Sequence, residues 1–291
     1  MTSAKVSPQP GAAALERAME KLVNTGAIDV PMLPEVAGKV VRLAQDADSD
    51  AAELAKLIQS DQILAGHVMR VANSALYTPN ASLVSLQQAI ARLGMKLISE
   101  IALGASINSS LFNAPGYDDH IQYVIRHSLL SGLWAKEIAR ACRRNVEAAF
   151  LTGLLHDIGR PVATQAIITK AKKLEIPIQK PVLFALENQF QRTIGVKVVE
   201  QWEMPSTVVE VVRYFDDYNA AGEAKNQTMI ACAGSLFASH FMCRPGDEGC
   251  MTRGELIGQA VLGDLDLYQD EVEEILEKED VVKSAMEALS A

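Results

Sequence analysis

The stretch LTGLLHDIGR, residues 151–160, places His156 directly before Asp157 in an apolar, helix-forming context. An imidazole and a carboxylate on one helix can bind the same cation, and a second helix can add His127 from YVIRHSLLSGLWA upstream. Mixed nitrogen and oxygen ligands suit transition divalent ions, and water bound to such an ion can attack a phosphate ester. His127, His156 and Asp157, here called the His–Asp trio, are therefore a candidate metal site.

The same three residues also fit a structural role. His127 shares a helix face with Leu130 and Trp134, which is typical of a hydrogen-bonded interior histidine. Asp157 can accept a hydrogen bond from an imidazole N–H and so tie two helices together inside the core. A competent hydrolytic site also needs further ligands, usually including a second carboxylate. Residue types alone therefore leave both a metal site and a structural pair open.

Helix signals dominate the sequence on both sides of this stretch. Capping pairs with a spacing of three residues begin at Asp50, Ser85 and Thr252, and Gly94 is placed to end the helix that Ser85 starts. Alternation of apolar and polar residues with a period of two is nearly absent, so no strand is expected. The chain is predicted to be an all-α protein of about a dozen short helices.

The helices are expected to form two packed subdomains. Residues 1–11 are predicted to be disordered, residues 12–112 to form an N-terminal helical bundle, and residues 113–291 to form a second bundle. The boundary follows from NAPGYDDH, residues 113–120, because its proline and glycine favour a break between helices.

The end of the chain is predicted to be one acidic helix, residues 270–289. Between Asp264 and Asp280 there are nine acidic residues and one lysine, which is −8 of the net charge of −9. Apolar residues recur in this segment at helical spacing: Val272, Ile275, Leu276, Val282, Met286 and Leu289. The acidic run is therefore expected to be the solvated face of a packed helix, and not a detached tail.

The composition is that of a globular protein and excludes several functions. The chain has 291 residues, of which 49% are hydrophobic and 22% charged. No apolar run approaches the ~20 residues that cross a bilayer, and the N-terminus has no signal-peptide core. A cytoplasmic protein without membrane contact is therefore expected. Because the chain is acidic and lacks a long basic stripe, nucleic-acid binding is not expected.

Four cysteines are present, and none has the CxxC spacing of a structural zinc site. They are Cys142, Cys232, Cys243 and Cys250. A disulfide between Cys243 and Cys250 is conceivable across the loop RPGDEG. For a cytosolic chain of this size, free thiols are expected.

His127 followed by the His156–Asp157 pair resembles the HD superfamily of metal-dependent phosphohydrolases. The N-terminal half is similar to the HDOD domain, the HD-related output domain of bacterial signalling proteins. The similar stretches are LPEVAGKVVRLAQDAD, SDQILAGHVMRVANSALYT and VSLQQAIARLGMKLISEIAL, with hallmark residues Asp61, Asn73, Ser74 and Gly94. The resemblance covers residues 25–289, with an HDOD core at 25–225, and implies an N-terminal helical bundle packed on an HD-like bundle.

The chain departs from active HD proteins at the positions of further metal ligands. Where the resemblance implies such ligands, this sequence has Gln191, Phe215 with Asp216, and Gly234. Only the His–Asp trio remains, and Asp216 or Asp217 could substitute if its side chain points toward the trio. Three ligands could hold one weakly bound divalent ion but are a poor scaffold for a two-metal hydrolase.

The resemblance implies a role in signal transduction. We expect a non-catalytic regulatory or output module in a bacterial cytoplasm, acting through contacts with a signalling protein or a small ligand. No cofactor is expected beyond a weakly bound divalent ion. One alternative is a metal-dependent phosphohydrolase that acts on a nucleotide or cyclic dinucleotide through the His–Asp trio. A second alternative is a scaffold that only binds another protein.

Overall fold

The computed structural model describes residues 11–46, 48–74, 76–78, 83–243 and 250–290, and in these ranges every regular element is a helix. The all-α prediction is confirmed. Residues 1–10, nearly all of the segment predicted to be disordered, lie outside the described residues. Gly11 is described, and with φ of 107° it forms the turn that starts the first helix.

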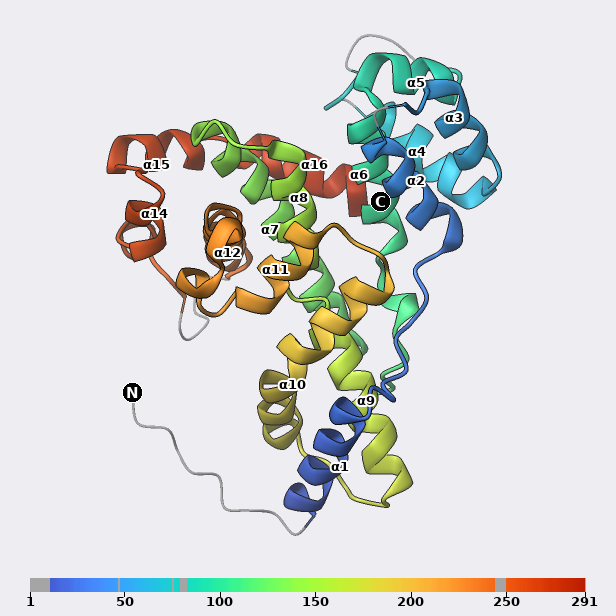
Figure 1. Cartoon of the computed structure of the whole chain (residues 1–291). Coiled ribbons are helices and arrows are strands. Elements are labelled where there is room, and N and C mark those ends of the chain that lie inside the picture. Colours follow the sequence, from blue (N-terminus) through green and yellow to red (C-terminus); the bar gives the residue numbers. More distant parts are fainter. Residues whose placement is uncertain (1–10, 47, 75, 79–82, 244–249, 291) are drawn as a thin grey trace.

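The helices α2 to α6 form an N-terminal lobe, at the upper right of Figure 1. They are α2 (Glu35–Gln45), α3 (Ala51–Gln59), α4 (Gln62–Ala72), α5 (Leu86–Leu93) and α6 (Met95–Ser106). Asp50, Asp61 and Ser85 begin three of these helices, because each side chain accepts a hydrogen bond from a backbone N–H of the first turn. Gly94 ends α5 with a φ of 83°, a conformation that glycine adopts without strain.

The hallmark residues shape the turns of this lobe. Besides Asp61 and Gly94, Asn73 holds the segment after α4. Its Nδ2 donates to the carbonyl of Leu83 at 2.9 Å, and its Oδ1 accepts from the N–H of the same residue at 2.6 Å. The carbonyl of Ser74 accepts the N–H groups of Tyr77 and Thr78. These residues therefore position backbone and lie outside the His–Asp trio.

The second lobe is built around α7 (Asp118–Ala141) and α8 (Val146–Leu155), which lie at the centre of Figure 1. Around them lie α9 (Gly159–Lys173), α10 (Lys180–Gln201), α11 (Ser206–Tyr214) and α12 (Lys225–Met242). The short helices η1 (Ser109–Leu111), η2 (Tyr218–Ala220), η3 (Gly222–Ala224), α13 (Arg253–Ile257) and α14 (Ala260–Asp264) complete the connections. At the start of α13, Thr252 and Glu255 form the predicted capping box.

Two pairs of glycines allow close helix contacts in this lobe. A Cβ on Gly153 of α8 would lie 2.7 Å from the Cα of Gly132 on α7. A Cβ on Gly159 of α9 would lie 2.6 Å from the backbone nitrogen of Gly195 on α10, and 1.9 Å from the carbonyl oxygen of Gln191. In both contacts the nearest atoms are backbone atoms, so a side-chain rotation cannot make room for a Cβ. One glycine of each pair, Gly153 and Gly159, lies within residues 151–160, and the two lie on either side of His156 and Asp157.

The first helix, α1 (Ala12–Asn24), packs against α9 and α10, at the bottom of Figure 1. Leu15 and Met19 are fully buried in this contact. Residues 25–34 then lead to the N-terminal lobe, and on the way the carbonyl of Pro31 accepts a hydrogen bond from the Trp202 indole. The residues 12–112 therefore do not pack as one bundle, because the apolar face of α1 is buried by the second lobe.

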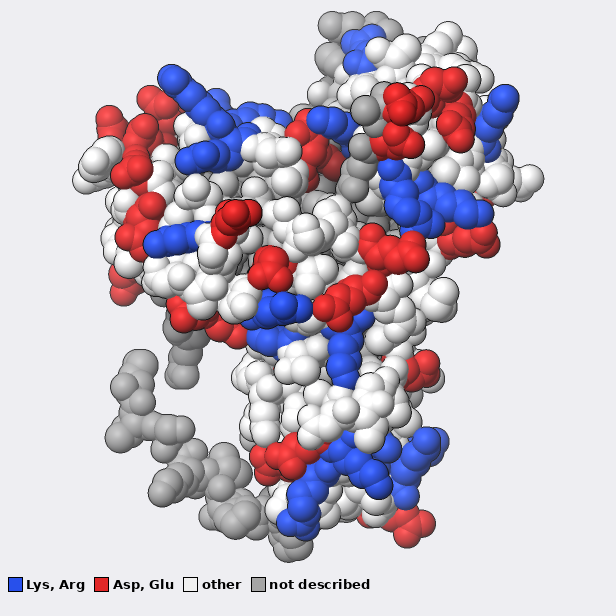
Figure 2. Space-filling view, in the orientation of Figure 1, with Lys and Arg blue, Asp and Glu red and all other residues white. Residues whose placement is uncertain are grey.

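The acidic end of the chain forms two helices, α15 (Gln269–Leu276) and α16 (Glu279–Ser290), and not the single helix predicted. Glu277 and Lys278 form a turn between them. The predicted apolar stripe is nevertheless buried in full, with each of its six side chains at most 8% exposed. In Figure 2, acidic side chains gather on the surface over α14 and α15, while Lys and Arg form separate groups. The acidic run is thus the solvated face of packed helices.

The expectation of free thiols is wrong for one pair of cysteines. Cys243 and Cys250 form a disulfide with their Cα atoms 5.7 Å apart, whereas Cys142 and Cys232 are free. The end of α12 and the residues before α13 bring the two cysteines within bonding distance. Among the helices of the described residues, none combines the length and apolarity needed to cross a bilayer.

The contact at Gly159 leads to a stability prediction. Gly159→Ala should lower the free energy of unfolding by about 3 kcal/mol or more, because backbone atoms cannot move away from the new Cβ. The matched control is Gly66→Ala in α4, where no atom lies within 4 Å of the new Cβ. This control should be neutral or stabilising by up to about 1 kcal/mol. Urea unfolding measures both; equal effects would contradict the proposed contact.

Candidate functional site

The structure brings the His–Asp trio together. His127 lies in the middle of α7, His156 directly follows α8, and Asp157 lies in the turn before α9. Each residue presents a ligand atom within 4.8 Å of those of the other two. All three side chains are buried, with residues exposed by 9% (His127), 1% (His156) and 9% (Asp157). The juxtaposition predicted from the sequence is therefore present, in the interior of the second lobe.

A local hydrogen bond orients the imidazole ring of His156 toward the site. Its Nδ1 donates a hydrogen bond to the carbonyl of Gly153, one turn earlier, at 2.6 Å. Nε2 is then the unprotonated nitrogen, and it lies buried without a hydrogen-bond partner, 3.5 Å from Oδ2 of Asp157. The ring of Phe215 stacks on the imidazole at a centroid distance of 4.5 Å. Burial lowers the pKa of His156, so the ring is neutral.

His127 faces α12 as well as the trio. Its Nε2 lies 3.0 Å from the hydroxyl of Ser239. Ser131, one turn further along α7, donates to the carbonyl of His127 at 2.7 Å. Burial, with a smaller effect of His156, lowers the pKa of His127 to about 4. His127 is therefore a neutral, hydrogen-bonded interior histidine at pH 7.

Two arginines hold the carboxylate of Asp157. Arg160 donates from Nε to Oδ2 at 2.9 Å, and Nη2 of Arg192 lies 3.1 Å from Oδ1. Burial opposes ionisation of Asp157, but neighbouring positive charge holds its pKa well below the usual range. Because His156 is neutral, the two guanidinium groups supply that charge. Each oxygen of the one carboxylate in the trio thus lies within ion-pair distance of a cation of the protein, and Oδ2 is also hydrogen-bonded, whereas Oδ1 makes no hydrogen bond.

Arg192 links the site to three more groups. Its Nη1 donates to the carbonyl of His156 at 2.5 Å, and its Nε donates to Asp216 at 2.9 Å. Its guanidinium lies over the ring of Phe215, 4.5 Å from the centroid. One side chain from α10 therefore contacts His156, Asp157 and the residues that follow α11.

Arg160 extends the network to α10 and α7 through Glu187. The carboxylate of Glu187 accepts from Arg160 at 2.8 Å, from Thr164 at 2.5 Å and from His120 at 2.6 Å. Although Glu187 is only 1% exposed, each of its oxygens is satisfied. Hydrogen bonds to these donors outweigh burial and lower the pKa of Glu187. Buried polar networks of this kind specify one arrangement of the helices that they join.

The positions expected to carry further ligands play other roles. Gln191 is buried beside Gly159, and Phe215 stacks on His156. The side chain of Asp216 is 65% exposed and pairs with Arg192, while Asp217 caps η2 by accepting the N–H of Asn219. Gly234 lies in α12 against the backbone of α7, where a Cβ would come within 2.6 Å of the Ser131 carbonyl. Neither Asp216 nor Asp217 joins the trio in the described residues.

Sequence reasoning missed the two arginines and Glu187. Arg160 carried a signal, because it follows Asp157 by three residues and i,i+3 pairs lie side by side on a helical turn. Arg192 and Glu187 carried none, since they lie 35 and 30 residues after Asp157 along the chain. Only the packing of α10 on α9 brings them to the site.

The paired state of Asp157 leads to a second stability prediction. In metal-free buffer, Asp157→Ala should lower the free energy of unfolding by about 3 kcal/mol, because it leaves two largely buried guanidinium groups without their shared partner. The control is Asp216→Ala, which removes the exposed partner of Arg192 and should cost at most about 1 kcal/mol. If chemical unfolding in chelator finds Asp157→Ala as stable as wild type, the clamp is not structural.

The depressed pKa of His127 predicts a pH dependence. Between pH 6.5 and pH 4, His127 is protonated in the unfolded chain but neutral in the folded protein. The free energy of unfolding therefore falls as the pH falls through this window. From pH 7 to pH 5 this loss should be about 2 kcal/mol. His127→Gln should remove that share of the loss, which urea titrations at both pH values would measure. A variant that loses as much stability as wild type would contradict a neutral His127.

Comparison with known proteins places this geometry in a family. The HDOD domain model matches residues 30–218. An HDOD domain protein of unknown function from Geobacter sulfurreducens is 19% identical, with a TM-score of 0.71 over 95% of this chain and 97% of that one. A candidate metal-dependent phosphohydrolase from Shewanella amazonensis SB2B is 22% identical, with a TM-score of 0.73 over 96% of this chain and 99% of that one.

Two further relatives are longer than this chain. A candidate signal transduction protein from Marinobacter aquaeolei VT8 is 22% identical, with a TM-score of 0.66 over 97% of this chain and 67% of that one. An uncharacterised protein from Treponema pallidum (strain Nichols) is 23% identical over 67% of this chain, and the match spans 39% of the relative's length. The HDOD model covers well over half of the sequence, and the chain therefore belongs to the HDOD domain family.

Proposed function

We propose that this protein is a non-catalytic regulatory or output module of bacterial signal transduction, in which the His–Asp trio has become a structural centre. Membership of the HDOD family and the likeness to a candidate signal transduction protein support the signalling role. The module would act through contacts with a signalling protein or a small ligand in the cytoplasm.

The arginine clamp on Asp157 carries this proposal. A two-metal hydrolytic site needs ligands on both ions and a carboxylate free to bind them. Here the trio offers three ligand atoms, and both oxygens of its carboxylate already contact Arg160 and Arg192. A divalent ion at Asp157 would also meet two fixed positive charges within a few ångströms. The donor set therefore fits a catalytic metal pair poorly.

Burial of the trio supports the same proposal. His156 is 1% exposed, and Phe215 and Arg192 lie against it and against each other. A phosphate ester would therefore meet a centre whose three residues are each at most 9% exposed. Catalysis of hydrolysis requires that the scissile bond come within hydrogen-bond reach of the acting groups.

One observation favours the alternative of a metal-dependent phosphohydrolase. The hydrogen bond from Nδ1 of His156 to the Gly153 carbonyl leaves Nε2 free, which is the arrangement that metal-binding histidines adopt. If an ion displaced Arg192 from Asp157, the trio could hold it. The substrate would then be a nucleotide or cyclic dinucleotide, and its turnover would depend on that ion.

Loading with Mn²⁺ and removal of the clamp test these proposals together. Wild type dialysed against Mn²⁺ should retain no stoichiometric metal, and its melting temperature should be the same in Mn²⁺ and in chelator. Arg192→Gln removes one positive charge from Asp157 and should make the melting temperature rise with Mn²⁺. The matched control, Arg213→Gln, removes an arginine from exposed ion pairs on α11 and should create no response.

The opposite result would favour the enzyme. Elemental analysis showing about one or two ions per wild-type chain, lost in His156→Ala together with phosphodiesterase turnover, would overturn the non-catalytic proposal. Bis(p-nitrophenyl) phosphate and cyclic dinucleotides are suitable substrates for that assay.

A further inference from the structure

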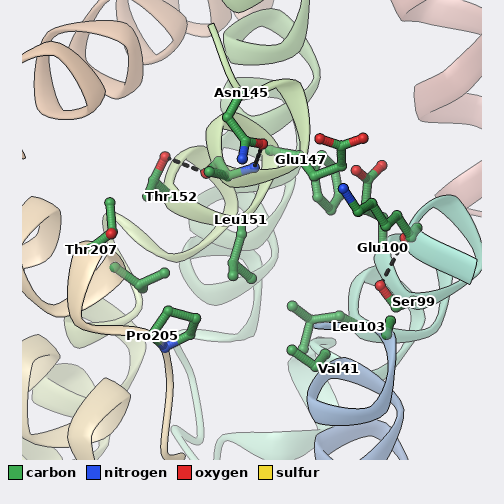
Figure 3. Close-up of a pocket in the computed structure, with 15 residues that line it drawn as sticks. Val41, Ser99, Glu100, Leu103, Asn145, Glu147, Leu151, Thr152, Pro205 and Thr207 are labelled. Carbon is green, nitrogen blue, oxygen red and sulfur yellow. Dashed lines mark hydrogen bonds between the residues drawn. The ribbon is translucent and has the colours of Figure 1, made fainter. Parts of the chain in front are cut away.

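A cavity of about 320 Å³ lies between the two lobes, and none of the His–Asp trio lines it. Figure 3 shows its walls, with Val41 and Leu103 from the N-terminal lobe on one side and Leu151 and Pro205 from the second lobe on the other. Cavities that bind small molecules begin at about 300 Å³ and are mainly apolar with a few polar groups. The cavity thus has the size and lining for a small ligand.

Two hydroxyl groups of the lining, those of Ser99 and Thr152, donate their hydrogens to backbone carbonyls. Ser99 donates to the carbonyl of Lys96 at 2.7 Å, and Thr152 donates to the carbonyl of Ala148 at 2.8 Å. Thr152 also accepts from Gln227 at 3.0 Å. What these hydroxyls can offer a ligand is therefore oxygen lone pairs. The amide of Asn145 and the exposed ammonium of Lys96 are donors in the lining.

Glu100 provides the strongest acceptor. It lies on α6, is 9% exposed, and accepts a hydrogen bond through Oε2 from Lys136 at 2.5 Å. Within the described part of the chain its other oxygen, Oε1, has no hydrogen-bond partner. An ionised carboxylate can accept about four hydrogen bonds. Oε1 is not one of the fully buried unpaired atoms of the described residues, so it is open to solvent and available to a donor in the cavity.

Glu147 of α8 adds a second carboxylate at the same end of the cavity, as Figure 3 shows. Burial raises the pKa of Glu100, and Lys136 acts in the opposite direction; the negative charge of Glu147 adds a smaller upward effect and Arg140 a smaller downward one. The exposed carboxylate of Glu147 and the Glu100–Lys136 ion pair therefore share this end of an apolar space. A cation placed between the two carboxylates would donate to the open oxygen of Glu100 and lie beside a second negative charge.

We infer that this cavity binds a small organic cation, a primary amine or amidine on an apolar body, with its charged end between Glu100 and Glu147. The apolar body would occupy the space between Val41, Leu103, Leu151 and Pro205. Such a ligand would bridge the two lobes, because Glu100 belongs to the N-terminal lobe and Glu147 to the second. The inference rests on the proposed function, for which it supplies the class of small ligand.

Three probes of one shape and different charge test the inference on the full chain. Benzylamine, benzyl alcohol and benzoate share a ring and a methylene or carbonyl carbon but are cationic, neutral and anionic at pH 7. Titrations followed by NMR chemical shifts of the protein should show saturable binding of benzylamine, at least about tenfold weaker binding of benzyl alcohol, and no binding of benzoate.

Variants with matched controls locate the site. Ala148→Leu places a larger side chain into the cavity and should abolish binding, whereas Ala166→Leu, at a half-buried alanine of α9, should leave it unchanged. Glu147→Gln should weaken the binding of benzylamine about threefold and leave the binding of benzyl alcohol unchanged. The substitution removes an exposed negative charge, which attracts only the cationic probe. The control Glu274→Gln lies on α15, outside the cavity lining, and should change neither probe.

Equal affinity for benzylamine and benzyl alcohol, or unchanged binding in Ala148→Leu, would overturn the inference. Failure of all three probes to bind would overturn it as well. These readouts need no metal and no turnover, so the inference can fail while the Mn²⁺ and phosphodiesterase assays still support a non-catalytic module. Conversely, a metal-dependent turnover would overturn the proposed function without any change in benzylamine binding.

Discussion

The carboxylate of Asp157 is held between the guanidinium groups of Arg160 and Arg192, and the arrangement of α8, α9 and α10 depends on this contact. A buried ion pair adds little net stability compared with apolar packing, because both ions lose their hydration. Loss of one partner is costly, however, since the remaining charge is then buried alone. The clamp therefore acts mainly by excluding other arrangements of these helices. It also places a fixed positive charge beside each oxygen that a metal ion would require.

The clamp is possible because the helices approach closely on both sides of it. Gly153 and Gly159 bracket the His–Asp pair, and each meets backbone atoms of a neighbouring helix. A larger residue at either position would separate the helices and move Asp157 away from Arg192. Ten consecutive residues thus supply two close helix contacts of the second lobe and the charged group at its centre.

Under these proposals, function divides between two places in the fold. The centre of the second lobe is buried, charge-balanced and closed by Phe215, which suits a structural role. The cavity between the lobes has unused acceptors and walls from both lobes, which suits the binding of a ligand. α8 joins the two places, because Thr152 lines the cavity and His156 follows it by one turn. A ligand between the lobes would therefore contact the same helix that ends at the clamp.

Local sequence was sufficient for much of this description. Capping residues and apolar periodicity predicted the helices, the buried stripe from Val272 to Leu289, and the all-α fold, because these depend on hydrogen bonds and spacing within one turn or helix. The resemblance of short motifs predicted the HDOD family and singled out the His–Asp trio, whose members the structure places together.

Tertiary structure alone decided which groups surround that trio. The direction of Arg192 and Glu187 depends on how α10 packs on α9, and no local pattern records that packing. The same holds for α1, which is buried by helices more than a hundred residues away. The free oxygen of Glu100 faces a cavity that exists only where the lobes meet. The physical reason is the same for Arg192, Glu187, α1 and Glu100: the chemistry of a side chain belongs to the residue, but its neighbours are set by the packing of distant helices.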